Sequence, residues 1–132
     1  MNFFIAKVKT IEKVEELTLI TLFIKNQSLQ LIALEISSRL KVGSMVTLEV
    51  KSSSVILAPL SSGVKSSANQ LMCCVKNVSY GELLCVVEVD LEGCMIESMA
   101  LKQSIKEMNI QKYDTLLALI NPTELSIGKI YG

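Results

Sequence analysis

The chain has 132 residues, half of them hydrophobic, and its 13 basic and 13 acidic residues cancel to a net charge of zero. A chain of this length suits one domain or two very small ones. Histidine is absent, so imidazole is excluded as a metal ligand, a general base or a triad member. No basic stripe with interleaved aromatic residues occurs, which argues against nucleic-acid binding.

The apolar residues are spread over short runs. None approaches the length of a membrane-spanning helix, and the start, MNFFIAKVKT, lacks the basic and long apolar regions of a signal peptide. We therefore expect a cytoplasmic protein with no membrane partner. The mean hydropathy is high, +0.46. Because small domains bury little surface alone, we expect the excess apolar residues in a core or a subunit interface, and a homo-oligomer rather than a monomer.

The four cysteines form no CxxC pair. They are Cys73, Cys74, Cys85 and Cys94. Their spacing does not fit a thiolate metal site, and no sequence feature supports a redox role. We expect buried or half-buried free thiols in a reducing cytosol, and no metal site.

Five short apolar runs in the first half predict five strands. Each is rich in Val, Ile, Leu and Thr and ends at polar or glycine positions. In chain order they are FFIAKVKTIEKV (3–14), ELTLITLFIK (16–25), LQLIALEI (29–36), MVTLEVK (45–51) and SVILA (54–58).

A Ser/Gly/Pro-containing linker, APLSSGVKSS (58–67), separates this half from the next. The second half repeats the five-strand pattern. Its runs are QLMCCVKNV (70–78), ELLCVVEVDL (82–91), CMIESMA (94–100), DTLLALI (114–120) and TELSI (123–127). Between the third and fourth runs, LKQSIKEMNIQ (101–111) has apolar residues at helical spacing and no helix breaker, which predicts a short helix.

The two halves align as a tandem duplication. Residues 2–12 lie over 69–79, and 50–57 lie over 120–127. In the second strands, Glu16-Leu17 lies over Glu82-Leu83. The offset therefore grows by about four residues between the second and fourth strands, so we expect the first half to lack roughly one helical turn around Ile36 to Arg39. The pattern predicts an all-β protein with a short helix, built as two tandem five-stranded barrels of the oligonucleotide/oligosaccharide-binding (OB) type. The predicted domains are 1–58 and 68–132, joined by the linker 59–67.

The second half resembles a Mop (molybdopterin-binding-protein-like) domain of the TOBE class. The residues that carry the resemblance are, in order, SSANQL (66–71), Val75, Val78, Gly81, QSIKEM (103–108) and ALINPTEL (118–125). The first half matches less well, but its end, VKSSSV (50–55), keeps a family lysine, Lys51, where the second half has Asn121. Together the halves resemble a tandem-Mop "molbindin". The resemblance implies small β-barrels that assemble, commonly as trimers, and hold molybdate or tungstate between domains or subunits.

The resemblance also implies where an oxyanion would bind. The family uses its opening loop, the start of its helix and its late turn. Carried over, these positions are Ser66, Ser67, Ala68 and Asn69 for the loop, Ser104 for the helix start, and Lys51, Ser52 and Asn121 for the late turns. Hydroxyls, amides, backbone N–H groups and one ammonium are suitable donors for a tetrahedral dianion. Each residue also has a plain reading: a solvated lysine, turn serines, a helix-start serine and an Asn-Pro turn.

Three departures from the family pattern affect this site. Ala68 stands where the family has Arg, Leu101 stands where it has Thr before the helix, and Asn121 stands where it has Lys. One hypothesis is a composite site, in which Lys51 and Ser52 of one domain meet residues 66–69 of another, so that each half keeps what the other has lost.

Two functions follow from the sequence. The first is binding of molybdate or tungstate for intracellular storage, buffering or sensing. The alternative is a degenerate Mop-fold regulatory or protein-interaction module with no bound oxyanion. We do not expect an enzyme, because no credible catalytic set is present. No helix-turn-helix pattern and no phosphate-binding Gly-Lys-Ser/Thr loop occurs either.

Overall fold

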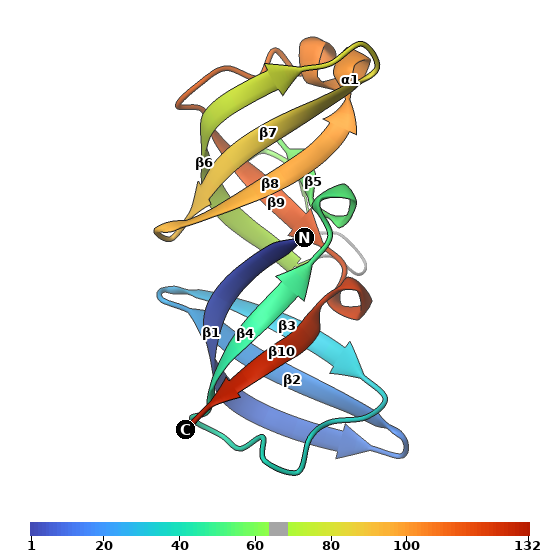
Figure 1. The fold of residues 1–132 in the computed structure, drawn as a ribbon, viewed down its shortest axis with the longest axis vertical. Helices are drawn as coiled ribbons and strands as arrows, with labels where there is room; N and C mark the ends of the chain where they lie inside the picture. Colours follow the sequence, from blue (N-terminus) through green and yellow to red (C-terminus); the bar gives the residue numbers. More distant parts are fainter. Residues whose placement is uncertain (64–68) are drawn as a thin grey trace.

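The computed structural model describes residues 1–63 and 69–132. Two curled five-stranded sheets follow one another along the long axis of the molecule (Figure 1). The predicted all-β class with a short helix is confirmed. No helix within the described ranges is long and apolar enough to cross a membrane.

All strand pairs in the first sheet are antiparallel. Its strand order is β10 (Ser126–Tyr131), β4 (Met45–Val50), β1 (Asn2–Val14), β2 (Leu17–Ile24) and β3 (Gln27–Ala33). The second sheet is also antiparallel. Its order is β5 (Ile56–Ala58), β9 (Thr115–Ile120), β6 (Asn69–Tyr80), β7 (Leu84–Leu91) and β8 (Cys94–Leu101).

The two halves of the chain exchange their last strands. β5, from the first half, pairs with β9 of the second sheet, and β10, from the second half, pairs with β4 of the first sheet. Each exchanged strand follows a short 3-10 turn, η1 (Ser52–Ser54) or η2 (Pro122–Glu124), that redirects the chain at the boundary between the sheets. Each sheet therefore contains strands from both predicted domains, 1–58 and 68–132, although each sheet was expected to form from one half of the chain.

The strands form where the sequence alternates. Every second residue of β2 from Thr18 to Ile24 is buried, and β7 repeats this pattern from Cys85 to Leu91. Successive side chains of a strand point to opposite faces, so one face of each sheet lines the interior. A single hydrophobic cluster spans both sheets, and Phe4 is its only fully buried aromatic residue. The core of the described residues is thus aliphatic, as the composition indicates.

The register of the first sheet is repeated in the second. β1 carries a bulge between Val8 and Thr10, and β6 carries one between Val75 and Asn77. Equivalent residues are 67 positions apart at these bulges, whereas Val50 and Ile120, which pair with the starts of β1 and β6, are 70 apart. The first half is therefore three residues shorter before β4, close to the four expected.

The difference in length lies at the predicted helix. In the second half, α1 (Lys102–Glu107) follows β8 directly and buries Ile105. In the first half, residues 34–44 connect β3 to β4 without a helix. Both the helix at 101–111 and its loss around Ile36 to Arg39 are confirmed, although α1 ends at Glu107.

Candidate functional site

Two equivalent 3-10 turns lie between the sheets. Lys51 precedes η1 and Asn121 precedes η2, and in each turn the N–H of the third following residue donates to the carbonyl of this residue at 2.9 Å. Sequence alone predicted Thr123 and Glu124 to begin the last strand; they lie in η2 instead, because Pro122 starts the turn and the Asn121 side chain caps it.

The two turns are joined across the halves. The Ser54 hydroxyl donates to Glu124 Oε2 at 3.3 Å, and Figure 1 shows both turns on the same side of the molecule. Each turn also contacts a strand of the other half: η1 contacts β8, and η2 contacts β3. A ligand bound at either turn would therefore lie at the boundary between the halves.

Lys51 is exposed and Ser52 is half-buried. Val50, just before them, pairs with Asn2, so the Lys51 turn lies beside the first residue of β1. This places an ammonium group and hydroxyl groups at the boundary between the sheets, where the donors of an oxyanion site are expected.

Asn69 already has hydrogen-bond partners. Its Oδ1 accepts from the Gln30 N–H at 2.8 Å, and its Nδ2 donates to the Gln30 carbonyl at 2.9 Å. The side chain thus ties β6 to the edge strand β3 of the other half. Ile120, which precedes Asn121, pairs with Asn69, so this predicted residue lies next to the second turn. Its amide is engaged in structure, which leaves less capacity for a ligand.

Asn2, in the first half, makes the equivalent contact to an edge strand of the second half. It was not predicted as a site residue. Its Nδ2 donates to the Glu97 carbonyl and its Oδ1 accepts from the Glu97 N–H, both at 2.8 Å. Asn2 is also one of three buried polar residues in the described chain. The sequence carried a usable signal, because Asn2 and Asn69 occupy equivalent positions of the repeat.

Asn121 is a weak substitute for a lysine. Its Oδ1 accepts from the Thr123 N–H at 3.0 Å and from the Thr123 hydroxyl at 2.9 Å. The carbonyl side of the amide therefore serves the turn, and only its NH2 group can donate to an anion. The Lys51 turn has the stronger donor of the two.

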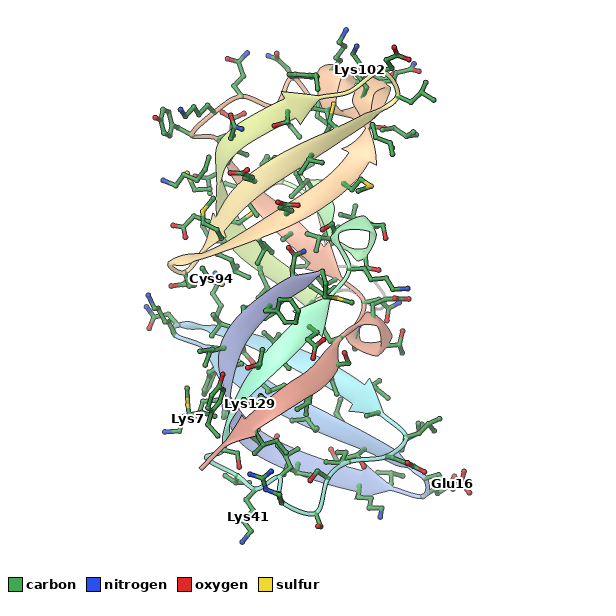
Figure 2. All side chains as sticks on the ribbon, viewed as in Figure 1. Lys7, Glu16, Lys41, Cys94, Lys102 and Lys129 are labelled. Atoms are coloured by element: carbon green, nitrogen blue, oxygen red, sulfur yellow. The ribbon has the colours of Figure 1, made fainter. Side chains whose placement is uncertain are left out.

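The remaining predicted residues are not brought to these turns in the described structure. Ser104 is exposed on α1, whose labelled neighbour Lys102 lies at the far end of the long axis from η1 and η2 (Figures 1 and 2). Ser66, Ser67 and Ala68 lie outside the described residues. The composite hypothesis joins Lys51 and Ser52 to residues 66–69. Of that loop only Asn69 lies among the described residues, and the contact between the two turns is the described link between the halves.

Ser98 also links the two halves at their boundary, and it was not predicted as a site residue. Its fully buried hydroxyl donates to the Val55 carbonyl at 2.6 Å, directly after η1. A short bond of this kind fixes the end of the Lys51 turn against β8. The turn is thus held on a rigid strand, which suits a pre-formed binding position.

Burial opposes thiolate formation at two of the four cysteines, Cys73 and Cys94. All four are free thiols, and burial, with smaller contributions from Cys74 and Asp90, raises the pKa of Cys73 to about 11. Burial and the Asp90 charge also raise the pKa of Cys94, which lies at the β7–β8 hairpin (Figure 2). A protonated thiol is a poor nucleophile and metal ligand. No group of three or more potential metal-binding side chains occurs among the described residues.

Comparison with protein-family models and with curated proteins finds no match. A solved structure does match: a crystal form, with molybdate bound, of the cytoplasmic molybdate-binding protein ModG. It is 26% identical, with a TM-score of 0.87, and the match covers 96% of this chain and 94% of that chain. The match spans both sheets, so this chain shares the whole Mop-like fold of a protein that binds molybdate.

Proposed function

We propose that this protein binds a tetrahedral oxyanion, molybdate or tungstate, in the cytoplasm, for storage, buffering or sensing. The observation that carries the proposal is the near-complete match to the molybdate-bound ModG structure, at a TM-score of 0.87 over 96% of the chain. A binder rather than an enzyme also agrees with the absence of histidine from the chain.

The proposed site is the boundary between the halves. The Lys51 ammonium and the Ser52 hydroxyl would donate there, with Asn121 NH2 and residues 66–68 as further donors. Asn69 would act chiefly by positioning, since its amide is bonded to Gln30. A tetrahedral dianion can be held by hydroxyl, amide and N–H donors with a single ammonium, so a net charge of zero does not oppose binding.

We extend the proposal to a homo-oligomer, a trimer or another assembly, in which a neighbouring copy completes the site. Ser104 is the residue that motivates this step, because α1, which carries it, lies at one end of the molecule and the two turns lie near its middle (Figure 1). Exposed apolar side chains on the outer faces of both sheets, such as Phe3, Ile5 and Met72, offer surface for such contacts.

A second candidate function is a Mop-fold regulatory or protein-interaction module without an oxyanion. Two observations favour it: Asn121 replaces the second lysine and its acceptor serves its own turn, and the Asn69 amide is occupied. The two candidates predict opposite responses to anions.

Thermal unfolding with an anion panel separates them. Molybdate and tungstate at about 100 times the dissociation constant should stabilise the folded protein by about 2.7 kcal/mol, which raises Tm by several degrees. Sulfate and phosphate serve as the control anions, and a protonated phosphate is disfavoured by a pocket of donors. The absence of a shift with every anion at millimolar concentration would favour the interaction module.

A further inference from the structure

The first sheet has an open seam that begins at Leu125, directly after η2. Its two edge strands are β3 and β10, and a cavity of about 240 Å³ lies between them. The connection from 35 to 40 borders the cavity on one side, and Leu125 borders it on another. Arg39 reaches across, its Nη2 donating to the Ile130 carbonyl at 3.5 Å.

The second half has a helix at the equivalent place in the chain. There α1 follows β8, and its Ile105 is 1% exposed within the core. Ala100 and Met108 pack against the same cluster. The helix therefore adds a buried aliphatic side chain to the core of the second half.

The first half lacks this helix, and the aliphatic residue of its connection, Ile36, is only half-buried at the cavity wall. This half is three residues shorter before β4, and residues 34–44 contain no helix. Leu31, Leu40 and Leu125 are buried around the cavity, with Ala33 and Ile130 half-buried at its wall. The cavity therefore has a mainly aliphatic wall and lies in the half of the chain that has no helix.

The lining decides the class of ligand. A cavity of about 150 Å³ lined by aliphatic and aromatic side chains stays dry and binds benzene. The present cavity is larger, and its polar members, Glu35, Ser37 and Ser126, are exposed at its mouth. We propose that the β3–β10 seam is a binding site for a small apolar molecule, with one or two fused aromatic rings or a branched aliphatic chain. This proposal does not depend on oxyanion binding.

An NMR titration with indole tests the proposal. Amide signals of Leu31, Ala33 and Ile130 should shift on addition of indole to the full-length protein, and signals of the second sheet should stay in place. Ala33→Leu, which adds apolar volume at the cavity wall, should weaken indole binding at least tenfold. The matched control is Ala100→Leu, at the equivalent position of the second half, which should leave indole affinity unchanged.

Three outcomes would overturn the site: no shift up to the solubility limit of indole, shifts spread evenly over both sheets, or equal affinity in Ala33→Leu and the wild type. The spectrum of each variant reports its folding, and Ala33→Val replaces Ala33→Leu if the larger side chain prevents folding. Molybdate is added in a separate titration, so failure of indole binding and failure of oxyanion binding are read independently.

Discussion

At the scale of single residues, two asparagines join the halves. Asn2 bonds both backbone groups of Glu97, and Asn69 bonds both backbone groups of Gln30. Each side-chain amide imitates the backbone of an additional strand, since it offers one donor and one acceptor to the same residue. These contacts hold the boundary at which the oxyanion site is proposed.

Asn2→Ala should destabilise the protein by about 1–3 kcal/mol, because it removes two hydrogen bonds and leaves partly buried backbone groups without partners. Asn69→Ala should cost less, because its bonds are exposed. Urea unfolding measures both changes. The control is Asn77→Ala, whose side chain donates a hydrogen bond to Ser79 on its own strand. Equal stability of Asn2→Ala and the control would show that the asparagine contact is not structural.

The Cys73 thiol makes the free energy of unfolding depend on pH in the alkaline range. Burial raises the pKa of its thiol from 9.0 to about 11, so the unfolded chain loses this proton at a lower pH than the folded one. The contribution is complete below pH 9 and is lost as the pH rises towards 11. The free energy of unfolding should thus fall more steeply over this range in the wild type than in Cys73→Ala. Parallel profiles for the two proteins would contradict the burial of this thiol.

Sequence reasoning reached the residues of the candidate site unevenly. The turn at Lys51 was recognisable because the second half provides an aligned copy, VKSSSV over INPTEL. The roles of Asn69 and Asn121 were not recognisable, because their amides bond to Gln30 and Thr123 in ways that only the folded backbone defines. Ser98 could not be found from the pattern either, since its partner, the Val55 carbonyl, lies on the other half of the chain.

At the scale of elements, nine of the ten strands and the helix were predicted close to their observed positions, whereas the last strand was predicted at 123–127 and lies at Ser126–Tyr131. Alternation of buried and exposed side chains depends on one buried face of the strand. Each strand here has such a face except the short exchanged strands β5 and β10. The partners of those two strands were not predictable. A strand of three to six residues carries too little pattern to say which sheet it joins, and neighbours in sequence are the usual expectation.

The strand exchange predicts an unusual response to truncation. Removal of β10, residues 126–132, takes the edge strand from the first sheet, although these residues belong to the second half. Amide hydrogen exchange should therefore accelerate in β4, whereas β9, which retains β5 and β6, should stay protected. Faster exchange in β9 with an unchanged β4 would mean that β10 pairs within its own half.

At the scale of the whole molecule, the exchange joins two small sheets into one unit. Each half of about 60 residues buries little surface alone. A single hydrophobic cluster, the exchanged strands and the turn-to-turn contact of Ser54 with Glu124 tie the halves together. The duplication was visible in the sequence, but this connection was not, because the two copies of a repeat look the same whichever sheet their last strands join.

The boundary between the halves is the part of the molecule on which the proposed function depends. It carries both 3-10 turns and both asparagine contacts, and the exposed ammonium of Lys51 is placed there by the turn that sends β5 across. Lys41 lies on the other side of the first sheet, at the end of the molecule away from this boundary (Figure 2). It offers a lysine of equal charge outside the proposed site.

Calorimetric titration of molybdate into the wild type, Lys51→Ala and Lys41→Ala tests the central claim most directly. A hydrogen bond to a charged group contributes about 1.5–3 kcal/mol, and 1.4 kcal/mol is tenfold in affinity. The account predicts binding by the wild type and Lys41→Ala with equal affinity, and binding about ten- to a hundredfold weaker in Lys51→Ala. Molybdate affinity that is unchanged in Lys51→Ala, or lowered equally in both variants, would contradict it.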